Sequence, residues 1–159
     1  MAESKKNFNE KEKDIPLLKK AEAEAEVSFT YSDKTLEHML TPRHLGMLTT
    51  PDGQAQFTGP CGDTMEVFLK IDDGVIRQAF FLADGCQHTI ACGDAICELA
   101  ETKTVKEAFQ INAEKLFDYL EGLPKDHVHC ASLAANTMRT ALLEYMEKRD
   151  EPWKKAYRK

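Results

Sequence analysis

Three of the five cysteines lie where glycine, proline or histidine marks a break in the chain, and thiol chemistry is the first function that the sequence suggests. Cys61 lies in a Gly-Pro-Cys-Gly-Asp segment that ends at Asp63, Cys86 follows an Asp-Gly pair, and Cys130 follows His129. Cys86 and Cys130 each stand at the start of a helical pattern, where free backbone amides and the helix dipole favour a thiolate. A thiolate beside a carboxylate or an imidazole can ligate a metal ion or act as a nucleophile.

Each of these positions also allows a role without such chemistry. Cys61 fits an incidental thiol in a loop, Cys86 a buried side chain that covers a turn, and Cys130 a capping and packing residue. The sequence has no C-x-x-C pair; 24 residues separate the first of these cysteines from the second, and 43 separate the second from the third. They form one site only if the fold brings three distant segments together.

The other two cysteines are expected in the core. Cys92 and Cys97 lie among Ile and Ala residues in a segment with a helical pattern. Five residues correspond to about 140° around a helix, so the two thiols cannot ligate one ion from one face. His88 is expected to be a surface histidine at the helix start. An additional role as a ligand in a metal site stays open for His88 and for Cys92.

After a first short helix, the predicted strands come before the remaining predicted helices. Alternating apolar residues over Asp63–Ile71 and Val75–Ala83 predict a β-hairpin, and its Asp73-Gly74 pair suits a type I′ turn. Turn residues before Gln54–Phe57 predict an edge strand there. Helices are expected over 34–40, 89–100, 105–109, 113–120 and 130–148. This order favours an α+β fold over alternating α/β architecture.

The composition limits the function classes. The 159 residues are 42% hydrophobic and 30% charged, which suits about one domain with its own core. A net charge of −6 disfavours a nucleic-acid partner, and no apolar run reaches the length of a membrane span. Because the first residues lack the apolar stretch of a secretory signal, we expect a cytoplasmic protein that binds neither nucleic acid nor membrane. Five cysteines in a reducing compartment are then thiols rather than disulfides.

We expect one folded domain between two charged ends. Residues 1–30 predict a charged, mobile N-terminal tail, and 31–148 the folded domain. Residues 149–159 predict a charged C-terminal tail or the end of a helix.

Five short motifs follow one another along the chain. They are Thr41-Pro42-Arg43-His44-Leu45-Gly46, Gly59-Pro60-Cys61-Gly62-Asp63, Lys70-Ile71-Asp72-Asp73-Gly74, Asp84-Gly85-Cys86 with Ile90-Ala91, and Leu123-Pro124 followed by His129-Cys130-Ala131-Ser132-Leu133-Ala134. In this order they resemble the IscU/NifU-type iron–sulfur cluster assembly scaffolds over roughly residues 33–147. The gap between the last two cysteines is similar to that of IscU-type members and lacks the insertion of the zinc-dependent SufU-type relatives.

The resemblance implies a fold and a ligand set. The fold is SufE/NifU-like α+β, with a small antiparallel sheet of about three strands packed against helices and a long C-terminal helix. Cys61, Cys86 and Cys130 would receive sulfur and bind iron in a transient [2Fe–2S] cluster, with Asp63 or His129 as a weaker ligand. The same residues would also bind Zn²⁺ tetrahedrally.

The resemblance also implies partners: a cysteine desulfurase, apo iron–sulfur proteins and a specialised Hsp70-type chaperone. That chaperone reads a Leu-Pro-Pro-Val-Lys stretch in this family, whereas this chain has Leu123-Pro124-Lys125-Asp126-His127, which leaves its recognition open. A homodimer stays open as well. We assign His38 and His127 only to the polar surface, and His44 to hydrogen bonding within its loop.

Three functions follow from these residues. The first is a scaffold, not an enzyme in the narrow sense, that accepts sulfur from a cysteine desulfurase, builds the cluster and transfers it to apo-proteins. The second is a zinc-binding sulfur acceptor or sulfurtransferase accessory protein that uses the same residues. The third is a hydrolase with Cys130 or Cys86 as nucleophile, for which the sequence indicates neither a pocket nor an oxyanion hole.

Overall fold

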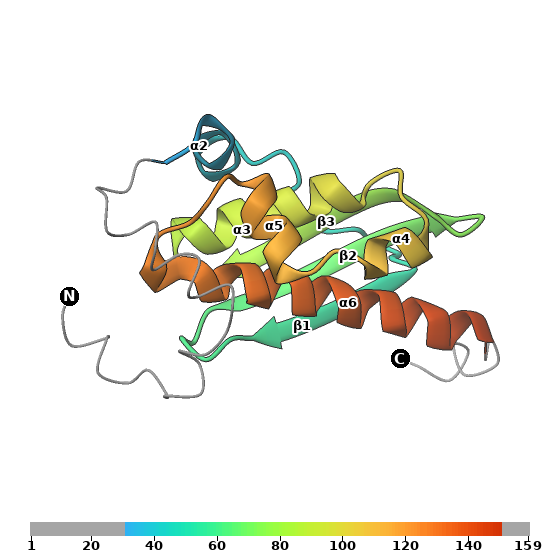
Figure 1. Ribbon diagram of the computed structural model, residues 1–159. Helices are drawn as coiled ribbons and strands as arrows, with labels where there is room; N and C mark the ends of the chain where they lie inside the picture. The colour runs from blue at the N-terminus through green and yellow to red at the C-terminus, as the bar shows by residue number, and fades with distance from the viewer. Residues whose placement is uncertain (1–30, 151–159) are drawn as a thin grey trace.

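The predicted hairpin supplies two of the three strands of an antiparallel sheet. The structure is a computed structural model, and it describes residues 31–150 (Figure 1). Strands β2 (Thr64–Asp72) and β3 (Val75–Asp84) form the hairpin, and β1 (Gly53–Thr58) pairs with β2 as an edge strand. Asp73 and Gly74 both have positive φ, 53° and 73°, as a type I′ turn requires. The predicted terminal tail over 1–30 and the last residues, 151–159, lie outside the described residues.

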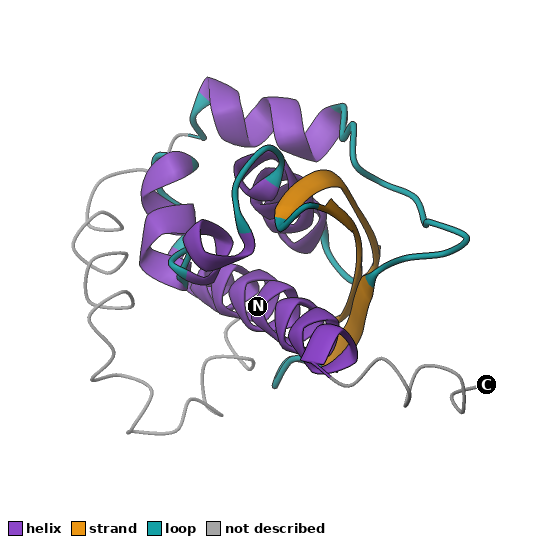
Figure 2. Ribbon diagram, turned by 90° about the vertical axis from the view of Figure 1, so that its right-hand side faces the viewer, coloured by secondary structure: helices purple, strands orange, loops and turns teal. Residues whose placement is uncertain are grey.

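The inner face of the sheet carries the core, as the alternation in β2 predicts. Four alternate residues of β2 are at most 7% exposed: Met65, Val67, Leu69 and Ile71. On the outer side, the segment that follows the first described helix runs along the sheet (Figure 2). Leu45 in this segment forms a parallel bridge with Phe81, and Asp52 N–H donates to Leu69 O. Phe68, which points to the outer face, is therefore also buried.

Helices cover the inner face. α3 (Gln87–Ala100) packs on β3, and α6 (Val128–Asp150) crosses β1 and β2 and also contacts α3. The approach of α3 to the sheet is close, because a Cβ on Gly93 would lie 2.5 Å from the ring of Phe81. Strands followed by covering helices, with a long last helix, confirm the predicted α+β fold.

The shorter helices begin after side chains that cap their first backbone N–H groups. α2 (Asp33–Leu40) begins after Ser32, whose hydroxyl accepts from Thr35 N–H at 3.0 Å. α4 (Val105–Phe109) and α5 (Ala113–Tyr119) begin after Thr104 and Asn112, whose side chains accept from the backbone in the same way. A 3₁₀ turn, η3 (Lys125–His127), leads into α6. The last helix therefore begins two residues before the predicted start, and none of the described helices is long and apolar enough to cross a membrane.

A buried ionic network fastens α2 to α3. Asp94 in α3 is 2% exposed and accepts from the backbone N–H groups of Arg43 and His44, both at 2.8 Å. Its other oxygen lies 2.5 Å from Nδ1 of His38. The assignment of His38 to the polar surface is wrong, because its side chain is buried in this network. His44, assigned to hydrogen bonding within its loop, instead bonds to Asp94 in α3 and contacts Glu101 at the end of that helix.

Candidate metal centre

The three cysteine-bearing segments meet at one end of the sheet. The register pairs Thr64, at the start of β2, with Asp84, at the end of β3. The loop that carries Cys61 and the turn that carries Cys86 therefore leave the sheet at the same end. α6 also begins near this end, so that Cys130 in its first turn reaches Cys86 (Figure 1).

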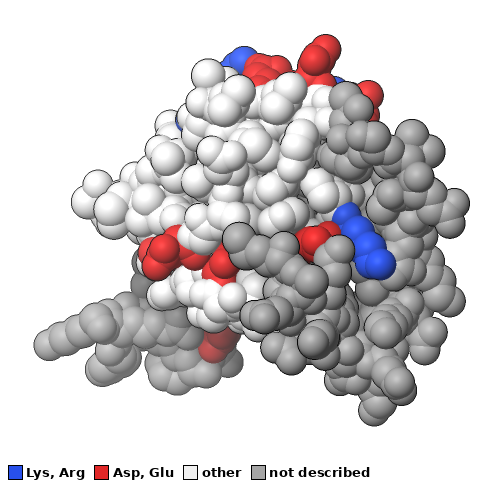
Figure 3. All heavy atoms as spheres, turned by 90° about the vertical axis from the view of Figure 1, so that its left-hand side faces the viewer, with Lys and Arg blue, Asp and Glu red and all other residues white. Residues whose placement is uncertain are grey.

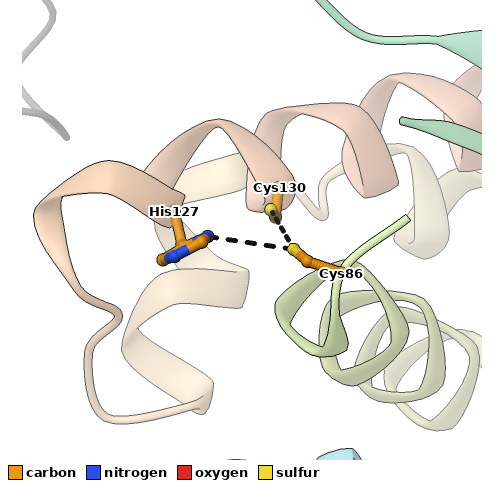
Figure 4. A group of neighbouring side chains, drawn as sticks. All are labelled: Cys86, His127 and Cys130. Atoms are coloured by element: carbon orange, nitrogen blue, oxygen red, sulfur yellow. Dashed lines mark hydrogen bonds between the residues drawn. The ribbon is translucent and has the colours of Figure 1, made fainter. Parts of the chain in front are cut away.

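Cys86, His127 and Cys130 turn their side chains toward one another (Figure 4). Cys86 Sγ lies 3.9 Å from Cys130 Sγ and 3.8 Å from His127 Nδ1. One ligand atom from each of the three residues lies within 4.8 Å of the other two. The group combines half-buried residues with a fully buried one, so it is accessible from one side.

The donor set suits an ion that prefers sulfur. Two sulfur atoms bound at about 2.3 Å to one tetrahedral ion lie about 3.8 Å apart, and a bound sulfur and nitrogen lie about 3.6 Å apart. The observed separations of 3.9 and 3.8 Å are close to both values. Thiolate and imidazole ligands select zinc, iron and iron–sulfur clusters rather than magnesium or calcium. The residues therefore fit iron–sulfur chemistry.

Mutual hydrogen bonding separates the pKa values of the two thiols. The contact with Cys130 lowers the pKa of Cys86 far below its usual value; burial opposes this shift, and the hydrogen bond with His127 supports it. The same contact, together with burial, raises the pKa of Cys130 far above its usual value. The contact between the two sulfur atoms therefore favours the thiolate at Cys86 and the thiol at Cys130.

Asp63 and Thr89 fix the position of Cys86. Asp63 Oδ2 accepts from the Thr89 hydroxyl at 2.6 Å and from Cys86 N–H at 3.3 Å. Thr89 Oγ1 also lies 3.5 Å from Cys86 Sγ and 3.4 Å from Cys130 Sγ. Gly85 makes this arrangement possible, because a Cβ there would lie 2.5 Å from Asp63 Oδ2. The carboxylate thus holds the start of α3 against the strand.

Cys61 and His129 lie outside the group of three. Cys61 is exposed in a tight loop, in which Gly62 has φ 90° and donates its N–H to Gly59 O at 3.0 Å. Burial raises the pKa of Cys61, and the charge of the Asp63 carboxylate adds to the shift. His129 is half-buried, and its ring centre lies 6.4 Å from that of His127.

His127 is the candidate that sequence reasoning misses, and its assignment to the polar surface is wrong. It directly precedes α6 and lies three residues before Cys130, a spacing that places both side chains on one side of a helix. His129 is next to Cys130 and points about 100° away around the helix. The His-x-His-Cys spacing at a helix start is the signal that could have identified His127.

A second imidazole lies against the first. The rings of His88 and His127 stack with centres 3.6 Å apart and planes 10° apart. His88 Nε2 lies 2.8 Å from Tyr31 Oη, and His88 Nδ1 is buried with no hydrogen-bond partner among the described residues. His88 is thus half-buried beside the candidate centre rather than on the open surface.

The remaining two cysteines lie in the core, as predicted. Cys92 and Cys97 are 0% exposed, and burial raises the pKa of both thiols. Their thiols are therefore protonated at neutral pH and act as small apolar side chains.

The face at the end where α6 begins carries few charges. Figure 3 shows this end of the molecule, and where described residues are visible most of its surface is uncharged. Asp and Glu atoms lie at its upper edge and in a band below its centre, with Lys or Arg atoms at the right (Figure 3).

The comparisons of sequence point in one direction. The model of the NifU-like N terminal domain matches residues 30–152. The iron-sulfur cluster assembly scaffold protein IscU 1 of Archaeoglobus fulgidus is 37% identical over 119 residues, which cover 74% of this chain and 78% of the relative. The IscU scaffold protein of Escherichia coli K12 is 33% identical over 125 residues, which cover 76% and 97%.

Solved structures share the fold. The N-terminal part of a nitrogen-fixing NifU-like protein from Brucella abortus has a TM-score of 0.61 at 20% identity, covering 74% of this chain and 94% of that one. A putative iron-sulfur cluster assembly scaffold protein for the SUF system from Fervidobacterium islandicum has a TM-score of 0.60 at 20% identity, covering 70% and 96%.

Proposed function

Because the chain belongs to the family of NifU-like N-terminal domains, we propose that it is a scaffold that assembles iron–sulfur clusters and passes them to apo-proteins. The names of the curated relatives favour this function over a zinc-binding sulfur acceptor. The observation that carries the proposal is the position of Cys86 Sγ, which lies 3.9 Å from Cys130 Sγ and 3.8 Å from His127 Nδ1. This is a sulfur-rich donor set on one side of an accessible end of the fold.

The cluster is the cargo of such a protein rather than a resident cofactor, and we propose the [2Fe–2S] type. Its thiolate ligands are Cys61, Cys86 and Cys130, and Asp63 or His129 supplies the weaker ligand. Three thiolates and one oxygen or nitrogen donor hold a cluster less firmly than four thiolates. A ligand that exchanges readily lets an acceptor protein take the cluster over.

Exposure of the three thiols differs in a way that suits stepwise loading. Cys61 is exposed, Cys86 is half-buried and Cys130 is buried. An incoming sulfur donor meets Cys61 first, while Cys86 and Cys130 are already held together. In this proposal Cys61 joins the other two thiolates as the cluster forms.

The partners of the chain follow from this cycle. A cysteine desulfurase supplies sulfur, and apo iron–sulfur proteins accept the cluster. The uncharged end face suits docking through apolar and hydrogen-bonding contacts rather than through charge. The domain that carries out this exchange comprises residues 31–148, and we place it in the cytoplasm, where thiols stay reduced. Ligand exchange requires no catalytic turnover by the scaffold itself.

Anaerobic reconstitution tests the function. Wild-type protein given ferrous iron, cysteine, a cysteine desulfurase and dithiothreitol should turn brown and gain visible sulfur-to-iron charge-transfer absorption, with the dithiol as the reductant that completes the conversion of persulfide sulfur to sulfide. Cys61→Ser, Cys86→Ser and Cys130→Ser should each lose most of this absorption. Cys97→Ala is the matched control, because its thiol lies in the core and should leave the spectrum unchanged. A colourless wild-type protein would refute the proposal.

A further inference from the structure

His127 completes a small site that is already assembled before any cluster exists. Its Nδ1 lies 3.8 Å from Cys86 Sγ, and the three ligand atoms of Cys86, His127 and Cys130 fit within 4.8 Å. The two distances from Cys86 Sγ, 3.8 Å to His127 Nδ1 and 3.9 Å to Cys130 Sγ, are close to those expected around a single tetrahedral ion. Cys61 and His129 are not members of this group.

The imidazole of His127 is held in place from behind. The parallel stack with His88, with ring centres 3.6 Å apart, restricts rotation of the His127 ring. Tyr31 Oη in turn holds His88 through Nε2 at 2.8 Å. A ring fixed in this way loses less conformational freedom when it ligates an ion.

One polar atom beside the site lacks a partner. Nδ1 of His88 is buried and makes no hydrogen bond to the described residues. Buried polar atoms are rarely left unpaired, and an ion or an ion-bound water is one of the usual reasons for an exception. The atom belongs to the ring that stacks on His127, so the unpaired nitrogen lies beside the three donor residues.

We propose that Cys86, Cys130 and His127 form an entry site for a single divalent first-row cation, with His88 and Tyr31 as positioning residues for the His127 ring. Resting on the proposed function, the cation is ferrous iron on its way into the cluster. Zn²⁺ and Co²⁺ share its preference for thiolate and imidazole and enter the same site. The fourth position stays open to solvent or to a later ligand.

His129 offers the sharpest contrast within the chain. Both histidines flank the start of α6, but only His127 has a ring nitrogen in the group with the two thiols. A site built on the adjacent His-Cys pair would depend on His129. The proposed site depends on His127 and tolerates the loss of His129.

Anaerobic titration of the full chain with Co²⁺ measures this site directly. Wild-type protein should gain thiolate-to-cobalt absorption in the near ultraviolet and the intense visible bands of tetrahedral Co²⁺. His127→Ala and the closer-sized His127→Gln should weaken binding by about 10–100-fold, measured by competition with a chelator. His129→Ala should bind the single Co²⁺ ion as wild type does, even if it weakens the later cluster, for which His129 is a proposed ligand. Circular dichroism establishes that each variant is folded.

A second pair of variants tests the positioning role. His88→Phe keeps a flat ring for stacking and should retain affinity within about threefold, whereas His88→Ala should lose about tenfold and broaden the visible bands. Competition among Co²⁺, Zn²⁺ and Fe²⁺ should show one shared site. Wild-type affinity in both folded His127 variants would overturn the proposal, as would loss of binding in His129→Ala.

The outcomes separate this inference from the proposed function. If wild-type protein assembles a cluster but folded His127→Gln binds Co²⁺ normally, the entry site is wrong and the scaffold function stands. If Co²⁺ binds as described but no cluster forms with iron and sulfur, the entry site stands and the scaffold function is wrong.

Discussion

Single atoms decide how the candidate centre is arranged. Asp63 Oδ2 is shared between Cys86 N–H and the Thr89 hydroxyl, so one carboxylate sets the position of a thiolate and of its neighbouring donor. Gly85 leaves the space in which that carboxylate lies. Asp63 can therefore act in two ways, as an exchangeable ligand of the cluster and as a support for Cys86.

Substitution of Asp63 separates these two roles. If the carboxylate keeps the cluster exchangeable, Asp63→Ala should hold a reconstituted cluster longer than wild type does. Asp63→Asn should behave similarly and also keep an oxygen that accepts from Cys86 N–H. The decay of visible absorption in the presence of a chelator measures the lifetime. Faster decay in both variants would mean that Asp63 is a needed anchor.

Gly85→Ala should disturb the centre through a steric clash. The new Cβ would lie 2.5 Å from Asp63 Oδ2 and Cγ, so the carboxylate must move, at a cost of about 1–3 kcal/mol in unfolding free energy. Gly59→Ala is the matched control, because its nearest contact is Leu133 at 3.6 Å, an ordinary separation. Denaturant unfolding of both variants compares them. Equal stabilities would contradict the close approach of Asp63 to the turn.

At the scale of elements, α2 is held to α3 by charge as well as by packing. His38 lies between Asp94 and Glu98, at 2.5 and 3.1 Å. His44 lies between Asp94 and Glu101, at 3.1 and 3.2 Å. Each imidazole thus faces two carboxylates of α3 or its cap, and only the doubly protonated ring donates to both. The contacts of His44 make the attachment of the segment after α2 dependent on pH.

The pH dependence has a definite sign. Hydrogen bonding to Asp94 raises the pKa of His44, although burial lowers it. The charge of Glu101 raises this pKa further. The stabilisation is therefore complete below the unfolded value of 6.5 and is lost as the pH rises through the folded value. Although burial opposes it, bonding to His38 and His44 lowers the pKa of Asp94. That contribution is complete above the ordinary value of 3.8 and is lost as the pH falls through the folded value.

The unfolding free energies of His44→Gln and wild type, compared at each pH, measure the part of this dependence that is due to His44. The loss of unfolding free energy on substitution should be largest below pH 6.5 and should shrink as the pH rises above it, because glutamine has no charge to lose. Denaturant unfolding from pH 5 to pH 9 gives the difference at each pH. Arg43→Gln is the control, since that side chain pairs with Glu37 on the surface and should give a difference independent of pH in this range. A difference for His44→Gln that grows with pH would contradict the network.

The elements themselves could be predicted because their signals are local. Alternation marks β2, Asp73-Gly74 marks the turn, and Thr104 and Asn112 mark two helix starts. What escaped prediction depends on contacts between distant segments. His38 reaches Asp94 56 positions away, and His127 reaches Cys86 41 positions away. A surface histidine and a buried ionic one have the same local sequence signature, so only the fold distinguishes them.

At the scale of the molecule, the candidate centre joins two structural layers. Cys86 belongs to the end of the hairpin and the start of α3, whereas Cys130 belongs to α6, which covers the rest of the sheet. An ion bound by both residues links these elements, in addition to the core that they share. Because an unfolded chain does not present the same site, binding must stabilise the fold.

Cation binding should therefore raise the thermal midpoint of unfolding. At a free Zn²⁺ concentration 100 times the dissociation constant, the gain is about 2.7 kcal/mol. Cys130→Ala should remove the gain, because it deletes one of the thiols that bridge the layers. Cys97→Ala should lower the midpoint through lost core packing but keep the gain on adding Zn²⁺. Differential scanning calorimetry with and without Zn²⁺ distinguishes the two. An undiminished gain in Cys130→Ala would place the ion elsewhere.

Cluster assembly is tested most directly by one anaerobic sample of reconstituted wild-type protein. Its visible absorption spectrum and its contents of iron, acid-labile sulfide and zinc are measured together. A [2Fe–2S] scaffold should show charge-transfer bands with iron and sulfide in about equal amounts, about two of each per cluster, and little zinc. A colourless sample with stoichiometric zinc and no sulfide would contradict the scaffold function.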